Sequence, residues 1–340
     1  MKIENNQPLS GHSTMRLGGP AKFLMNITSR EQITEAVEWA KKNNCKIIMI
    51  GHGSNIVWQD SGFDGLVLVN KIPGFNVNQQ GDEYIVKLGA GEVWDEVVNK
   101  LVVQGLSGVE QLSLIPGTVG ATPVQNVGAY GRELSEVLIS VEAFDLSENK
   151  FVEIANEDCG FSYRKSRFNQ QDSDRFLICA ITLKLHKANP APPFYATLEK
   201  YLSEHRITEY TPLNIRSAVI EIRNSKLPDP AKVANCGSFF GNPIVNKTKL
   251  LELKTGYPEI QSWDMKNSTY KVSAAWLLDQ LGLKGYKDPS TGMALWHAQP
   301  LVFVNENAKS TKDLLSFREK IKSKVQEKFG IDLKQEPELI

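Results

Sequence analysis

The spacing of apolar residues in the first 70 or so positions predicts an α/β unit. A capping box at Ser29 and Gln32 precedes apolar residues at helical spacing in 33–40. Short apolar runs at 46–50 and 66–69 predict buried strands on either side of a turn at 51–55. The predicted order is therefore strand, helix, strand, loop, strand, which is typical of layered α/β proteins.

The middle of the chain alternates strand patterns with amphipathic helices. Residues 84–88 alternate like a strand and lead through three small residues into a helix over 94–101, which Gly105 closes. Two further strands are expected at 137–146 and 176–185, and a helix from Pro212 to about 225. Prolines mark 188–195 as a surface loop.

The last third begins at a proline-rich break. Leu227-Pro228-Asp229-Pro230 ends the preceding helix and is the expected domain boundary. Beyond it, the pattern predicts helices near 247–254, 273–280 and 311–329, with a strand at 301–304.

Length and charge narrow the classes of protein. A chain of 340 residues predicts two or three domains. Its 39 basic and 39 acidic side chains provide no global field for nucleic acid or an anionic membrane, so an anionic ligand needs local cations. Four scattered cysteines and five histidines form no zinc pattern. No secretory or membrane-spanning segment is evident, so a cytoplasmic protein is expected.

Two glycine-containing segments are candidates for a ligand-binding backbone. Gly51-His52-Gly53-Ser54-Asn55 follows a predicted strand, and its amides can form an anion nest, although a plain tight turn is the simpler interpretation. It lacks the spacing of a nicotinamide-binding fingerprint. Residues 115–131 carry four glycines in a nearly uncharged run, which suits a backbone wrapped around a flat ligand.

The remaining candidates are polar residues in uncharged surroundings. Ser238 lies between a glycine and two phenylalanines but outside a hydrolase elbow, so a capping serine is the simpler interpretation. Arg164 and Arg223 could each bind a carboxylate through two oxygens, and Lys226 suits a phosphate or an enolic oxygen. Isolated surface cations are the alternative.

Taken in order, the motifs of the chain resemble those of the UDP-N-acetylenolpyruvoylglucosamine reductase family over essentially its whole length. The matching segments are Ser13–Ala21, Gly51–Asn55, Pro116–Gly131, Phe161–Arg164, Lys226–Pro230, Gly237–Pro243 and Glu336–Glu338.

The resemblance implies an α/β (α+β) architecture. A two-lobed FAD-binding domain of the vanillyl-alcohol-oxidase type would comprise residues 1–70 and 71–226, and an α/β domain over 227–340 would bind a UDP-sugar, with the extreme C-terminus returning to the active site. FAD would be bound non-covalently, with NADPH as co-substrate. The implied reaction reduces UDP-N-acetylglucosamine enolpyruvate to UDP-N-acetylmuramate, a step of peptidoglycan precursor and cell-wall synthesis. A monomer acting on small molecules, and not on nucleic acid or membrane, is expected.

The resemblance also assigns roles to individual residues. The catalytic set would be Ser238 as proton donor, with Arg164 and Glu338 at the substrate carboxylate. Cofactor binding falls to Gly51, His52, Gly53, Ser54, Asn55, Pro116, Gly117, Thr118, Gly120, Ala121, Gln125, Asn126, Gly128, Ala129 and Gly131. Substrate binding falls to Tyr163, Tyr195, Arg223, Lys226, Asn242, Lys271 and Gln299, with Tyr195 closing over the substrate from its proline-rich loop.

Two alternatives remain open at this stage. A flavin-dependent alcohol or sugar oxidase of the same fold often attaches its flavin through a histidine, and His52 lies in a suitable loop. The segment around Ser238 and the run Lys226–Pro230 argue against it. A non-catalytic module that binds a flavin or a UDP-sugar is the second alternative.

Overall fold

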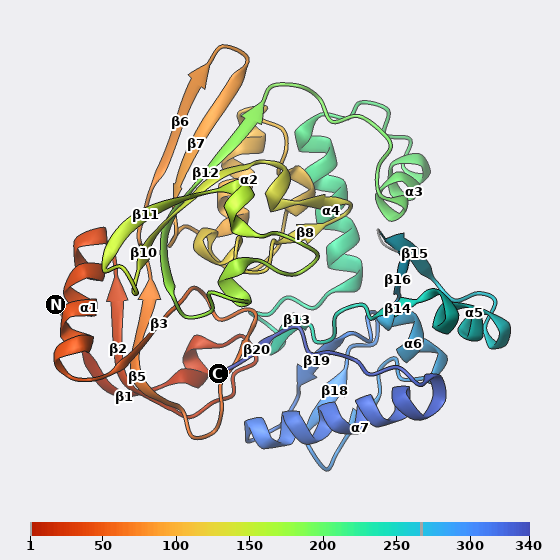
Figure 1. Cartoon of the computed structure of the whole chain (residues 1–340). Coiled ribbons are helices and arrows are strands. Elements are labelled where there is room, and N and C mark those ends of the chain that lie inside the picture. Colours follow the sequence, from red (N-terminus) through yellow and green to blue (C-terminus); the bar gives the residue numbers. More distant parts are fainter. Residues whose placement is uncertain (1, 266–267) are drawn as a thin grey trace. The chain divides into compact units, whose positions relative to one another are not determined.

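The computed structural model describes residues 2–265 and 268–340, which form two compact units (Figure 1). Unit 1 comprises Met1–Gln7, Ala21–His52 and Phe63–Ser225, and unit 2 comprises Pro8–Pro20, Gly53–Gly62 and Lys226–Ile340. No helix among the described residues is both long and apolar enough to cross a bilayer.

The first sheet of unit 1 follows the predicted α/β pattern. Its strand order is β1-β2-β5-β3, and β5 pairs in parallel with both β2 and β3. The Ser29 hydroxyl accepts from the Gln32 amide at the start of α1, as the capping box predicts. Apolar residues of α1 then pack on the sheet. The bounds are β1 (Glu4–Pro8), β2 (Pro20–Ile27), α1 (Arg30–Lys42), β3 (Lys46–Ile50) and β5 (Phe63–Asn70).

The second sheet of unit 1 is antiparallel, in the order β11-β10-β12-β7-β6. Helix α2 covers it, with Trp94, Val97 and Leu101 fully buried against the central strands. The bounds are β6 (Phe75–Gln80), β7 (Glu83–Gly89), α2 (Trp94–Val103), β10 (Leu138–Asp145), β11 (Lys150–Ala155) and β12 (Phe176–His186); a short hairpin joins β8 (Gly128–Ala129) to β9 (Arg132–Glu133), and α3 (Ala196–Glu204) and α4 (Pro212–Lys226) follow.

Unit 2 is built on two small sheets and a parallel pair of strands. The orders are β13-β19-β18-β17 and β14-β16-β15, and β20 pairs in parallel with β4. Helix α7 begins at a capping box on Ser310 and ends at Gly330, whose φ of 63° suits glycine. The bounds are β4 (Ile56–Val57), β13 (Asn235–Ser238), β14 (Ile244–Asn246), α5 (Lys247–Gly256), β15 (Ser262–Met265), β16 (Thr269–Val272), α6 (Ala274–Gln280), β17 (Lys287–Asp288), β18 (Met293–Leu295), β19 (Val302–Asn305), α7 (Thr311–Phe329) and β20 (Glu338–Leu339).

Short 3-10 helices lie in the loops of the described residues. They are η1 (Leu9–His12), η2 (Glu110–Leu112), η3 (Val119–Ala121), η4 (Leu134–Glu136), η5 (Asn156–Cys159) and η6 (Arg167–Asn169).

The compact units cut across the domain limits expected from the sequence. Residues 8–20 and 53–62 lie inside the expected first lobe, yet they belong to unit 2. Burial explains this, because Met15 and Val57 lie in one hydrophobic core with Phe303 and Phe317. The two expected lobes share a core in unit 1, where Leu66 packs with strand residues beyond 140. The limits at 70 and 226 therefore stay predictions.

Candidate active site

Three glycine-containing segments of unit 1 come together. Gly51 lies so close to Thr118 that an added Cβ would overlap the threonine hydroxyl. Gly120 donates its amide to the Ala90 carbonyl (2.9 Å), and a Cβ on Gly120 would lie 2.6 Å from that of Ala90. The absence of side chains on these two glycines thus allows direct contact between the segments. The glycine-rich segment 115–131 is therefore fixed against residues 51 and 90 by backbone-to-backbone and backbone-to-side-chain packing.

Alanine at Gly51 tests this packing. We expect Gly51→Ala to lower the free energy of unfolding by about 1–3 kcal/mol, because the new methyl group overpacks against Thr118. Denaturant unfolding with flavin content measured in parallel checks this. Thr118→Ala in the same chain removes the clashing oxygen and should restore part of the loss. Equal stability of the single variant and the parent would contradict the close packing.

The other expected cofactor residues divide between the units. Unit 2 contains Gly53, Ser54 and Asn55. Unit 1 contains the others, which are Gly51, His52, Pro116, Gly117, Thr118, Ala121, Gln125, Gly128, Ala129 and Gly131. Asn126 is fully buried; its Nδ2 donates to Glu133 Oε2 (2.7 Å), and its Oδ1 accepts from the Ser135 amide (3.0 Å). The side chain of Asn126 therefore supports the segment from within.

Tyr163 and Arg164 form the tip of a tight turn in unit 1. Ser162 and Lys165 exchange two main-chain hydrogen bonds of 3.0 Å and close the turn. Arg164 has a φ of 57°, which is uncommon outside glycine. Its Nη1 donates to the Gly128 carbonyl (3.0 Å), and its guanidinium lies 5.3 Å from the centre of the Tyr163 ring. The turn thus attaches Arg164 directly to the glycine-rich segment.

A second arginine and two tyrosines lie in the same electrostatic environment. The buried Nε of Arg223 finds no hydrogen-bond acceptor among residues 2–265 and 268–340. Burial lowers the pKa of Arg223, and the charge of Arg164 lowers it further, while Tyr130 and Asp95 act in the opposite direction. Tyr195 meets the Tyr130 ring edge to face at 6.2 Å. Two half-buried guanidinium groups whose charges act on one another favour an anionic ligand.

Helix α4, which carries Arg223, is fixed to α2 by a buried ion pair. Arg216 donates to both carboxylate oxygens of Asp95 (2.6 and 3.0 Å) and to Asn99 Oδ1 (3.2 Å). Asp95 also accepts from the Leu114 amide, at the entrance to the glycine-rich segment. Desolvation raises the pKa of Asp95, but the bonds from Arg216 and Leu114 outweigh it and lower the pKa overall. The Asp95 carboxylate therefore connects helix α4, which carries Arg223, to the start of the glycine-rich segment.

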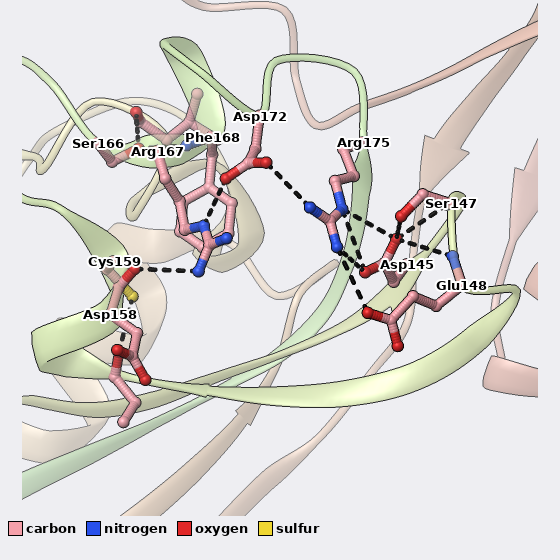
Figure 2. A network of polar contacts seen from close by, with 12 residues as sticks. Asp145, Ser147, Glu148, Asp158, Cys159, Ser166, Arg167, Phe168, Asp172 and Arg175 are labelled. Atoms are coloured by element: carbon pink, nitrogen blue, oxygen red, sulfur yellow. Dashed lines mark hydrogen bonds and ion pairs between the residues drawn. The ribbon is translucent and has the colours of Figure 1, made fainter.

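An ion network follows the Arg164 turn (Figure 2). Asp172 accepts from Arg167 Nε (2.7 Å) and from Arg175 Nη1 (3.2 Å). Arg175 in turn donates to Asp145 (2.6 and 3.1 Å), which also accepts from the Ser147 hydroxyl (2.6 Å). The network connects the end of β10 to the loop that holds the turn.

The buried carboxylate of this network predicts a pH-dependent stability. The bond from Arg175, supported by Ser147, holds the pKa of Asp145 well below its ordinary 3.8. Its contribution is therefore complete above about pH 4 and is lost as the pH falls. We expect Asp145→Asn to lower the free energy of unfolding by about 2–3 kcal/mol at neutral pH and by less at pH 3.

Denaturant unfolding across pH measures this difference. Asp64→Asn is the control, because it breaks an exposed pair with Lys22 and should change nothing measurable. A deficit in Asp145→Asn that stays constant from neutral pH to pH 3 would contradict the prediction.

In unit 2, Ser238 is the last residue of strand β13, which pairs with β19. The Asn235 side chain accepts from the Gly237 amide (2.9 Å) and shapes the turn before Ser238. Ser238 pairs with Val302 of β19. The next residue, Phe239, is fully buried, and its ring stacks on Phe303 at 4.3 Å. The backbone at Ser238 is therefore held by a strand on one side and a packed core beneath.

The C-terminal segment, residues 335–340, contacts the residue that follows Ser238. Glu336 donates its amide to the Phe239 carbonyl (2.9 Å), and Glu338 donates to the Asn55 carbonyl (2.9 Å). Residues 338–339 form β20, paired with β4. Gln335 accepts from Arg318 of α7 (2.8 Å). Unit 2 thus brings the serine segment, the carboxylate segment and part of the 51–55 loop together.

The other expected substrate residues of unit 2 are placed on separate elements. Asn242 Oδ1 accepts from the Ala274 amide (2.9 Å) at the start of α6. Lys271 lies on β16 with its Nζ 5.4 Å from the Trp263 ring. The main-chain oxygen of Gln299 accepts from the first residue of β19 (3.0 Å). Lys226 ends α4 with an exposed side chain, so its expected place beside the Ser238 hydroxyl stays a prediction.

Two family models match the chain. Residues 21–154 match a model described as FAD binding domain, and residues 229–340 match the C-terminal domain of UDP-N-acetylenolpyruvoylglucosamine reductase. The reductase of Cupriavidus pinatubonensis is 38% identical over 330 residues, covering 97% of each chain. That of Porphyromonas gingivalis strain W83 is 36% identical over 341 residues, covering all of both. The chain belongs to the UDP-N-acetylenolpyruvoylglucosamine reductase family.

The fold agrees with family membership. The crystal structure of UDP-N-acetylenolpyruvylglucosamine reductase (MurB) from Thermus caldophilus matches all of this chain and 99% of its own, with a TM-score of 0.70 at 24% identity. The α/β fold class expected from the sequence, with an FAD-binding domain and a C-terminal reductase domain, is confirmed.

Sequence patterns alone do not mark three polar residues of the chain. Tyr130 lies inside the glycine-rich segment, and burial raises its pKa although the charge of Arg223 opposes the shift. Its place between Ala129 and Gly131 is the one signal that could have identified it. Asp95 and Arg216 are ordinary amphipathic-helix residues in sequence, and only the fold pairs them.

Proposed function

We propose that the chain reduces UDP-N-acetylglucosamine enolpyruvate to UDP-N-acetylmuramate with NADPH, in peptidoglycan precursor synthesis. The observation that carries this is the full-length match to reductases in which both the FAD-binding and the C-terminal domain are represented. Residues 51–55 and 116–131, which lie within the part of the chain that matches the FAD binding domain, would hold FAD. When bound, FAD supplies the redox centre that accepts hydride from NADPH and returns it to the substrate.

Arg164 would bind the carboxylate of the enolpyruvyl group. Its guanidinium is fixed at the Gly128 carbonyl, and Arg223 adds a second positive charge nearby. Charge develops on the substrate carboxylate as hydride reaches the double bond. Preorganised donors at that position stabilise the transition state more than the ground state. Glu338 would supply a further polar group at the reacting end.

Ser238 would deliver the proton that completes the reduction. Its main chain is fixed between β19 and the buried phenylalanines, so the hydroxyl is presented from a rigid strand end. A serine hydroxyl is a weak acid, so donation needs a cation close to its oxygen. Lys226 is the candidate for that role.

The remaining candidates would bind the UDP-sugar. Tyr195 would contact the diphosphate from the loop that leads into α3, where it already packs on Tyr130. Asn242, Lys271 and Gln299 of unit 2, with Tyr163 of unit 1, would contact the rest of the substrate. We further propose that the protein is a cytoplasmic monomer; sedimentation of the purified protein tests the oligomeric state, and cell fractionation tests the compartment.

An oxidase of the same fold is the competing function. Burial lowers the pKa of His52, and Lys71 lowers it further, so a partly buried neutral histidine is available in the loop that such enzymes use. Acid precipitation separates the two functions. A colourless pellet with all flavin in the supernatant supports the reductase, whereas a yellow pellet supports covalent attachment.

Steady-state turnover tests the proposed reaction. NADPH oxidation that depends on the enolpyruvyl substrate, with UDP-N-acetylmuramate identified by mass spectrometry, is the expected result. NADPH oxidation that is independent of this substrate would overturn the proposal.

A further inference from the structure

The Asn169 side chain forms a hydrogen bond with the main chain of Arg164. Asn169 is the last residue of η6, five positions beyond the tip of the turn. Its Nδ2 donates to the Arg164 carbonyl (3.3 Å), and its Oδ1 accepts from the Ser166 amide (3.0 Å). One amide group therefore holds both ends of the segment that follows Arg164.

Arg164 needs such support because of its backbone conformation. A φ of 57° is sparsely populated by residues with a Cβ, and it persists only where the surroundings enforce it. The hydrogen bond from Asn169 binds the carbonyl of that same residue. Loss of the donor would let the peptide rotate toward a more populated conformation and displace the guanidinium.

The helical turn η6 is itself anchored on two sides. The Ser166 hydroxyl donates to the Val124 carbonyl (2.6 Å) in the glycine-rich segment. On the other side, Arg167 is held by Asp172, which continues to Arg175 and Asp145 (Figure 2). Because η6 is fixed on both sides, the Asn169 side chain holds the Arg164 carbonyl at a fixed place in unit 1.

We propose that Asn169 is a positioning residue that fixes Arg164 for binding the substrate carboxylate. The inference rests on the proposed function, because it assigns Asn169 to the step in which Arg164 acts. Asn169 contacts the arginine backbone and acts only through it. A displacement of about 1 Å at a binding group can cost on the order of 10²-fold in rate, so partial loss of the hold should be measurable.

Two variants isolate the hydrogen bond. Asn169→Asp keeps an oxygen that can accept from Ser166 but removes the donor to Arg164, and Asn169→Ala removes both. We expect each to lower kcat/KM for the enolpyruvyl substrate about 10-fold, with flavin reduction by NADPH within about 2-fold of the parent. Glu142→Gln is the control. Glu142 lies on β10, as Asp145 does, and the change weakens its ion pairs with Arg30 and Lys87. It should leave both half-reactions unchanged.

A double-mutant cycle with Arg164→Ala decides whether Asn169 acts through Arg164. If it does, Asn169→Asp causes no further loss when Arg164 is already alanine. Additive losses, or equal losses in both half-reactions, would overturn the proposal. If the parent enzyme reduces the substrate and the Asn169 variants match it, the positioning role alone fails. If the parent enzyme does not reduce the substrate, the proposed function fails first.

Discussion

Ser238→Ala is expected to slow reduction of the enolpyruvyl substrate by roughly 10²–10⁴-fold, which is the usual contribution of a positioned general acid. Flavin reduction by NADPH should stay intact, because that half-reaction requires no proton from Ser238. The backbone should not change, since β13 is fixed by its pairing with β19 and by Phe239 packing in the core. Stopped-flow absorbance of each half-reaction measures the two rates separately.

A second serine of unit 2 provides the control. The Ser310 hydroxyl accepts from the Asp313 amide and caps α7. Ser310→Ala should cost about 1 kcal/mol of stability without slowing either half-reaction. Equal slowing of both half-reactions by Ser238→Ala would contradict the role of Ser238 as proton donor.

Arg164→Ala is expected to lower the rate of the substrate half-reaction by about 10²–10³-fold, the range for removal of one preorganised charge-stabilising donor. The guanidinium is fixed at the Gly128 carbonyl, and its planar fork is suited to binding both oxygens of a carboxylate, which alanine cannot do. Arg164→Lys should recover only part of the rate, because a lysine cannot reproduce the planar fork.

The control for Arg164 is a surface arginine of the same unit. Arg30→Gln removes a guanidinium that pairs with Glu142 and covers Phe151, and it should leave substrate reduction unchanged. An Arg164→Ala enzyme that retains the parental rate with the enolpyruvyl substrate would remove Arg164 from the active site.

Elements with both a periodic apolar face and a terminal signal could be predicted from the sequence. Helix α7 is predicted near 311–329, and in the structure a capping box on Ser310 and a left-handed Gly330 form its two ends. The central strands β7, β10 and β12 were expected because they are buried and apolar. Edge strands β6 and β11 lie outside the predicted elements; β6 is mostly polar and exposed, whereas β11 is a short run of apolar residues interrupted by a glutamate.

The resemblance implies the candidate site residues, but local sequence patterns do not predict the hydrogen bonds and ion pairs that hold them in place. The contact of Asn169 with Arg164 and the pair Arg216–Asp95 depend on how distant segments fold together. Asn126 shows the same limit. Its place at the cofactor stays a prediction, and the hydrogen bonds of its buried side chain to Glu133 and Ser135 depend on the fold.

Anaerobic transfer of reducing equivalents tests the central claim most directly. The purified protein is reduced with a stoichiometric amount of NADPH, and UDP-N-acetylglucosamine enolpyruvate is then added while the flavin absorbance is followed. We predict return of the oxidised flavin spectrum together with formation of UDP-N-acetylmuramate. A flavin that stays reduced until oxygen is admitted would contradict the assigned substrate and favour an oxidase.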